Sequence, residues 1–137
     1  MPPKSLHETA LSPECPAGLP DYAELHCLSN FTFLRGASFP EELVERADEL
    51  GYRAIAITDE CSLSGVVRAH TVAKKKGTEL IIGSEFHLEE GCHFVLLACN
   101  RRGYGYLSHL ISCARRDTAK GSYRMDYAMV EQHLPGD

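Results

Sequence analysis

Five residues whose side chains can bind a metal ion stand at the edges of apolar segments. They are His26 near the end of "YAELHCL", Asp59 and Glu60 directly after "RAIAIT", Glu85 late in "ELIIGSEFHL", and His93 at the start of "CHFVLLAC". Imidazole and carboxylate groups together suit Zn, Mn or Fe. A metal held by such groups can activate water for phosphoester hydrolysis. These residue types therefore predict metal-dependent hydrolysis, provided that the fold brings them together.

Each of these residues also has a simpler structural explanation. A single histidine near a strand end, such as His26, is more often a hydrogen-bonded structural residue, and Asp59 before a helix is a credible N-cap. Glu85 is harder to explain in this way, since an unpaired carboxylate in an apolar strand is costly to bury. The other histidines show no comparable placement and are interpreted as surface or core residues: His7, His70, His87, His109 and His133. Spacing alone leaves both interpretations open.

The elements that must position these residues follow from the apolar periodicity. The expected elements are strands at 22–28, 53–58, 79–88 and 92–99, helices at 38–51, 63–76 and 105–116, and one more short helix near 128–132. Ser38 and Glu41 have the spacing of a capping box at the start of the first helix. Gly77 is placed to end the second helix. The alternation of strands and helices predicts an α/β fold with a mostly parallel sheet and right-handed crossovers.

The predicted sheet would bring the candidate residues to one edge. In such sheets the chemistry lies at the carboxyl ends of the strands. A tight turn at 89–91 predicts one hairpin, which returns His93 to the edge where Glu85 lies. Four strands are too few for a closed barrel but match the first half of one. We therefore expect His26, Asp59, Glu85 and His93 to share one cleft at one end of an incomplete barrel.

Composition excludes some classes of protein. The formal net charge of −5 argues against strong binding to DNA or to an anionic membrane. No apolar run approaches the roughly 20 residues of a membrane span. Residues 1–20 are rich in proline and predict a disordered tail. The six cysteines form no CxxC pair and the start has no apolar signal region, which predicts free thiols and a cytoplasmic protein.

Long stretches of the chain resemble one known family. In order between residue 22 and about residue 123 they are "AELHCLSNFTFLRGAS", "ELVERADELGYRAIAITDECSLSGVVRAH", "LIIGSEFHL", "HFVLLACNRRGYGYLSHLIS" and "ARRDTAKGSYR". They resemble the amino-terminal PHP (polymerase and histidinol phosphatase) domain of bacterial C-family DNA polymerases, above all the error-prone, translesion branch. The resemblance implies the first half of a distorted (βα)7 barrel, with a partial PHP domain at 21–137. It also implies a centre of up to three metal ions at the strand ends.

The resemblance assigns roles to the candidate residues. Four match ligand positions of the family: His26 in its HxH motif, Asp59 in its TDH motif, Glu85 in its GxE motif and His93 at the start of the next strand. Two positions are altered, because Leu28 replaces the second histidine of HxH and Glu60 replaces the histidine of TDH. Leu28 cannot bind a metal, and Glu60 changes both charge and geometry. The expected site is therefore degenerate, and we expect it to bind Zn, Mn or Fe weakly or not at all.

Three functions stay open at this point. The resemblance implies a fragment of an error-prone polymerase of DNA replication and repair, lacking the polymerase palm and serving a structural or docking role. The partners of the parent protein would be DNA and other replication or translesion proteins. The residue pattern alone also allows a metal-dependent phosphoesterase. A third alternative is a half barrel without independent function, because open strand edges favour aggregation.

Overall fold

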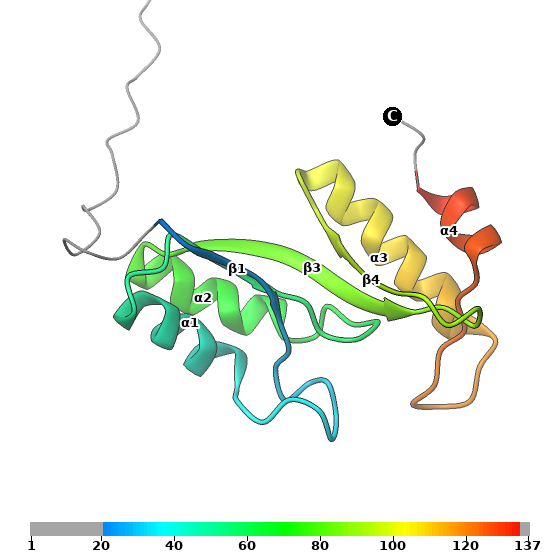
Figure 1. Cartoon of the computed structure of the whole chain (residues 1–137), viewed down its shortest axis with the longest axis horizontal. Coiled ribbons are helices and arrows are strands. Elements are labelled where there is room, and N and C mark those ends of the chain that lie inside the picture. Colours follow the sequence, from blue (N-terminus) through cyan, green and yellow to red (C-terminus); the bar gives the residue numbers. More distant parts are fainter. Residues whose placement is uncertain (1–20, 135–137) are drawn as a thin grey trace, which may run out of the picture.

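The computed structural model describes residues 21–134 as a four-stranded sheet with helices packed along it (Figure 1). In chain order the elements are β1 (Ala23–Cys27), α1 (Pro40–Glu49), β2 (Ala54–Ile57), α2 (Val66–Lys76), β3 (Glu79–His87), β4 (His93–Leu97), α3 (Arg101–Arg116) and α4 (Tyr127–His133). Every predicted strand and helix is present, including the short helix near 128–132. The tail predicted at 1–20 lies outside the described residues. No helix within 21–134 is long and apolar enough to cross a membrane.

The sheet has the strand order β1-β2-β3-β4, so β1 and β4 are its edge strands. β1 pairs with β2 and β2 with β3 in parallel, and β3 pairs with β4 antiparallel. β2 lies inside the sheet, and all four of its residues are buried, as is typical of a parallel strand covered on both faces. The mostly parallel, curled sheet with one hairpin confirms the predicted α/β half barrel (Figure 1).

Two apolar cores hold the helices to the sheet. One core joins α1 and α2 to β2 and consists of Val44, Ala47, Ile55, Ile57, Ala69 and Ala73. The other joins α3 to β3 and includes Phe86, Leu88, Leu107, Leu110, Ala114 and Met125. The first core thus holds β2 and the second holds β3. The polar residues predicted to form a site lie at the ends of these strands.

The first helix begins one residue later than the capping pattern predicts. Its N-cap is Phe39, whose backbone N–H donates to Oε2 of Glu42 at 2.8 Å. The predicted pair of Ser38 and Glu41 is therefore wrong. A phenylalanine side chain has no acceptor, so only the glutamate half of a capping box forms here.

The second helix begins later than predicted and ends where predicted. Its N-cap is Gly65, so the interpretation of Asp59 as an N-cap of this helix is wrong. Gly77 ends the helix at φ 82°, a left-handed conformation in which glycine carries no steric penalty. Asp59 is thus free for the role described below.

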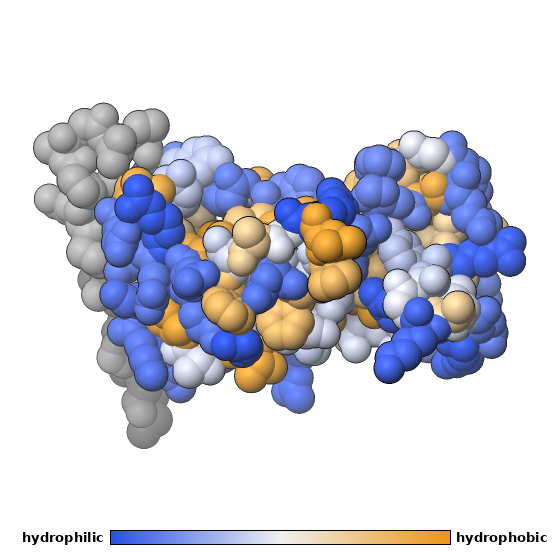
Figure 2. All heavy atoms as spheres, turned by 90° about the horizontal axis from the view of Figure 1, so that it is seen from below, coloured by the Kyte–Doolittle hydropathy of each residue, from blue (hydrophilic) through white to orange (hydrophobic). Residues whose placement is uncertain are grey.

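The loop between β1 and α1 is held in place by polar contacts more than by burial. Figure 2 shows apolar patches among hydrophilic residues on the face seen from below. At the tip of this loop Phe33 and Leu34 are 83% and 88% exposed, so they contribute little to either core. Backbone hydrogen bonds shape the loop, among them Thr32 N–H to Ser29 O at 2.9 Å and Gly36 N–H to Thr32 O at 3.0 Å.

Gly36 allows this loop to close. A Cβ atom at this position would lie 1.9 Å from the carbonyl oxygen of Ser29. We expect Gly36→Ala to lower the free energy of unfolding by about 1–3 kcal/mol, the typical cost of forcing an added methyl group into packed atoms. Urea denaturation measures this change.

The matched control is Gly105→Ala in α3, where an added Cβ meets no heavy atom within 4 Å. Because alanine favours the helix interior, this variant should be more stable by about 0.5–1 kcal/mol. Equal stability of the two variants would show that the loop tolerates a side chain at residue 36.

Candidate functional site

The carboxylate of Glu85 is the centre of a polar cluster at the carboxyl ends of the strands. Glu85 is only 4% exposed. Its Oε2 lies 2.5 Å from Nε2 of His26, and its Oε1 lies 2.7 Å from Nε2 of His87. The guanidinium of Arg35 also donates to Oε1. Both oxygens therefore have partners, as a buried carboxylate requires.

The strands deliver these groups to one place by simple geometry. Glu85 and His87 are two residues apart in β3 and so lie on the same face of the strand. Beyond the end of β2, Glu60 forms an isolated parallel bridge with Glu85. The backbone N–H of Cys61 donates to the carbonyl of Glu85 at 2.9 Å, which continues this pairing. The bridge places the two carboxylates side by side.

Arg35 connects the two carboxylates. Its guanidinium donates to Oε1 of Glu85 and also to Oε2 of Glu60, the latter at 2.8 Å. The hydrogen bonds to Glu85 and Glu60 raise the pKa of Arg35, so the guanidinium stays charged. Tyr123 donates its hydroxyl to the other oxygen of Glu60 at 2.8 Å. We call the group His26, Arg35, Glu60, Glu85 and His87 the rim cluster.

The charges of the rim cluster are set by these contacts. Burial opposes ionisation of Glu85, but hydrogen bonds from Arg35, His87 and His26 outweigh it and hold the pKa of Glu85 at about 2. Burial also opposes ionisation of Glu60, and hydrogen bonds from Arg35 and Tyr123 lower its pKa. Both carboxylates are therefore ionised at neutral pH, and a charged group of the chain itself lies between them.

The carboxylate of Asp59 is hydrogen-bonded to the loop after β1 and makes no side-chain hydrogen bond to the rim cluster within the described residues. It is 1% exposed. Its Oδ1 accepts from the Ser29 N–H and the Thr32 hydroxyl, both at 2.7 Å, and its Oδ2 accepts from the Ser29 hydroxyl at 2.6 Å. The polar residues that follow β1 thus enclose this carboxylate. Asp59 fastens the loop that carries Arg35 to the end of β2.

The hairpin places His93 at the rim, as the sequence predicts, but beside another histidine. His93 pairs with His87 in the β3–β4 register, and the two rings stack with centroids 3.8 Å apart. The side chain of His93 is exposed, whereas His87 contacts Glu85 directly. The interpretation of His87 as an unrelated surface or core residue is therefore wrong. Its position two residues after Glu85, on the same strand face, is the signal that would have identified it.

The ligand types of the rim suit a divalent cation, but Arg35 already interacts with the same atoms. Glu60, Glu85 and His87 offer three ligand atoms within 4.8 Å of one another. These are ligands that Zn, Mn or Fe accepts. A metal ion would have to displace the guanidinium from both carboxylates, because each oxygen of Glu85 is already paired. Glu60, Glu85 and His87 can therefore pair with either the guanidinium or a metal ion, but not with both at once.

Comparison with known proteins identifies the family. The family model described as the PHP domain matches residues 24–136. The chain belongs to the PHP domain family. An error-prone DNA polymerase of Dechloromonas aromatica is 64% identical over 117 residues, which are 85% of this chain and 11% of the relative. That of Methylococcus capsulatus is 61% identical over 112 residues, again 11% of the relative. The chain thus spans 11% of the length of these curated relatives.

Solved structures share the fold of this PHP domain. One, from Bifidobacterium adolescentis, is provisionally described as a metal-dependent phosphoesterase; it is 27% identical with a TM-score of 0.54, over 75% of this chain and 35% of the other. An amidohydrolase from Chromobacterium violaceum, with bound sulfate and no metal, is 24% identical with a TM-score of 0.58, over 69% of this chain and 33% of the other. At this identity the second match shows the fold alone.

The rim cluster predicts a pH dependence of stability. The ordinary pKa of a glutamate is 4.5, and that of Glu85 is lowered to about 2. Because the folded pKa is depressed, the stabilisation is complete above about pH 4.5 and disappears as the pH falls towards 2. Glu85→Gln should therefore lower the free energy of unfolding by about 3 kcal/mol at pH 7, and the difference from the wild type should shrink between pH 4.5 and 2.

Urea denaturation at a series of pH values measures this dependence. The control is Glu45→Gln on α1, where the carboxylate is exposed, and this variant should stay within about 0.5 kcal/mol of the wild type at every pH. A constant difference between Glu85→Gln and the wild type from pH 7 to pH 2 would contradict the predicted ionisation.

Proposed function

We propose that this chain is the PHP portion of an error-prone DNA polymerase and that it serves there as a structural or docking module without phosphoesterase activity. The identity of 64% and 61% to two such polymerases supports the first part. The observation that carries the second part is the guanidinium of Arg35, which bridges Glu60 and Glu85 in the cleft where the family resemblance expects metal ions.

The ion pairs of Arg35 with Glu60 and Glu85 make metal binding unfavourable for an electrostatic reason. A divalent ion next to the guanidinium would be repelled by its charge, and an ion that replaced it would have to break both ion pairs. One of these pairs involves a carboxylate that is almost fully buried. Leu28 supplies no ligand at the adjacent position of the family motif. We therefore expect the rim cluster to bind Zn, Mn or Fe weakly or not at all.

The cellular setting of the proposal follows from the relatives. A segment of a bacterial error-prone polymerase would work in the cytoplasm, in translesion synthesis and DNA repair. DNA and other replication or translesion proteins would be partners of the whole polymerase. Strong DNA binding by this segment itself is not expected, because its net charge is −5.

The arrangement of Glu60, Glu85 and His87 favours one alternative, a metal-dependent phosphoesterase. A structural neighbour described in that way shares the fold. Under this alternative Glu60, Glu85 and His87 would hold the ion, and the ion would supply a bound water of lowered pKa as the nucleophile. Arg35 would then have to move away from the carboxylates before catalysis.

A chimeric polymerase tests the proposed role. The segment of the Dechloromonas aromatica polymerase that matches this chain is replaced by residues 24–136, and primer extension is measured. We expect the chimera to extend primers, and the polymerase without any such segment to lose activity. His87→Asn in the chimera should leave extension unchanged, because no metal chemistry is needed from the rim.

Two results would contradict the proposal. The first is a folded chimera that cannot extend primers. The second is hydrolysis of a generic phosphodiester by the isolated chain in Mn²⁺ or Zn²⁺, if His87→Asn abolishes it. The second result would support the phosphoesterase alternative.

Removal of Arg35 should release the carboxylates for a metal ion. We expect Arg35→Ala to bind Mn²⁺ at least about tenfold more tightly than the wild type at pH 7, about 1.4 kcal/mol. Isothermal titration calorimetry measures the affinity, and circular dichroism checks that the variant is folded. Mn²⁺ is chosen because it prefers oxygen ligands over thiolates.

The matched control is Arg46→Ala, which removes an exposed guanidinium that pairs with Glu49 on α1. Its affinity for Mn²⁺ should equal that of the wild type. Equal affinity of Arg35→Ala and the wild type would show that the guanidinium does not compete with a metal.

A further inference from the structure

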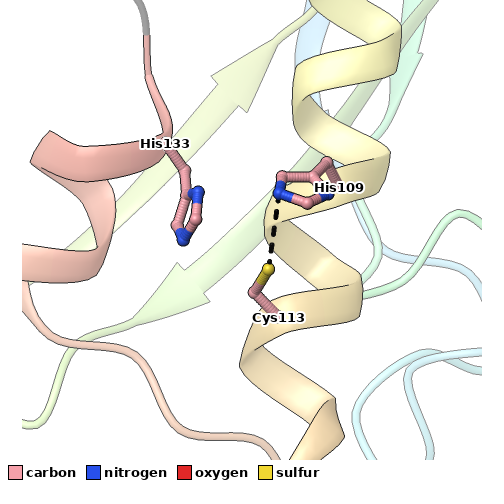
Figure 3. Close-up of side chains that lie close together, drawn as sticks. All are labelled: His109, Cys113 and His133. Carbon is pink, nitrogen blue, oxygen red and sulfur yellow. Dashed lines mark hydrogen bonds between the residues drawn. The ribbon is translucent and has the colours of Figure 1, made fainter.

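A second group of metal-ligating side chains lies between α3 and α4, apart from the rim cluster. His109 and Cys113 project from α3, and His133 faces them from the end of α4 (Figure 3). One ligand atom from each lies within 4.8 Å of the other two. The spacing of His109 and His133 in the sequence predicts only surface or core residues, so the tertiary structure alone brings this group together.

Two features of the fold bring the three residues together. His109 and Cys113 are four residues apart on α3, a spacing that places them on the same face of a helix. Met129, Val130 and Leu134 from the α4 region pack against the core that contains Leu107 and Leu110 of α3. This packing carries His133, in the last turn of α4, to the side of His109. The two rings meet edge to face with centroids 5.1 Å apart.

The separations suit a tetrahedral zinc ion. Nε2 of His109 and Sγ of Cys113 are 3.6 Å apart. With Zn–N of about 2.1 Å and Zn–S of about 2.3 Å, a tetrahedral ion holds its nitrogen and sulfur ligands about 3.6 Å apart. This pair therefore already has the required spacing. A ligand nitrogen of the half-buried His133 lies within 4.8 Å of both other ligand atoms, near enough to be the third ligand of the same ion.

The chemistry of the three groups also favours zinc. Imidazole and thiolate together are preferred ligands of Zn²⁺. Cys113 is a free thiol. His109 is exposed, so an ion can enter from solvent. On binding, the thiol of Cys113 loses its proton to water and its sulfur bonds to the ion as a thiolate.

We propose that His109, Cys113 and His133 form a zinc site that fastens α4 to α3, with water as the fourth ligand. None of the residues of α4 is fully buried. Its attachment otherwise depends on partly buried apolar side chains such as Met129 and Val130. An ion that binds the folded chain through both helices stabilises this attachment, because the unfolded chain does not present the three ligands together.

Cobalt substitution of the full chain tests the proposal. Co²⁺ bound by a thiolate gives a charge-transfer absorption band in the near ultraviolet. The rim ligands Glu60, Glu85 and His87 include no thiol, so this band reports on the proposed site and is independent of the proposed function. We expect the band in the wild type, and its loss in Cys113→Ser and in His133→Gln.

The control variant is Cys99→Ser, which removes an exposed thiol outside the proposed site and should keep the band. Zinc should also raise the melting temperature of the wild type and of Cys99→Ser more than that of His133→Gln. If Cys113→Ser fails to fold by circular dichroism, His133→Gln at the partly exposed end of α4 decides the question. No band in the wild type at saturating Co²⁺, or a band unchanged in a folded ligand variant, would overturn the proposal.

Discussion

The burial of the Glu85 carboxylate is the constraint that organises one end of this molecule. A charged group that is 4% exposed must be fully hydrogen-bonded, because the folded state otherwise loses its hydration without compensation. Its partners come from three segments: His26 from β1, Arg35 from the loop after β1, and His87 from β3 itself. One side chain thus couples the first strand, the first loop and the hairpin strand. A change at Glu85 therefore affects the whole rim.

Asp59 plays the corresponding part for the loop. Its two oxygens accept hydrogen bonds from Ser29 and Thr32, and the Thr32 hydroxyl also accepts from the Glu60 N–H at 3.0 Å. The contacts fix the loop after β1 against the end of β2. Because Phe33 and Leu34 at the loop tip are exposed, apolar burial cannot do this. The position of Arg35 thus depends on a neighbouring buried carboxylate as well as on its own ion pairs.

The altered position of the family motif at Glu60 and the position of Arg35 are related by electrostatics. Where the resemblance expects a neutral imidazole, Glu60 adds a second carboxylate next to Glu85. Two adjacent negative charges would repel each other without a cation between them. The guanidinium of Arg35 supplies that positive charge from within the chain, 2.8 Å from Glu60. A metal centre and an internal ion pair are two solutions to the same electrostatic requirement.

The sequence by itself determined the elements and the edge at which the polar residues gather. Periodicity and the turn at 89–91 define the strands and the hairpin, and strand geometry then predicts that His26, Asp59, Glu85 and His93 gather at one rim. Only the tertiary structure decided which groups contact these residues. Arg35 lies in an aperiodic loop, and His133 is 20 or more residues from its partners on α3, so no spacing rule relates them to a site. Their contacts depend on loop closure and helix packing, which arise from the summed interactions of segments far apart in the chain.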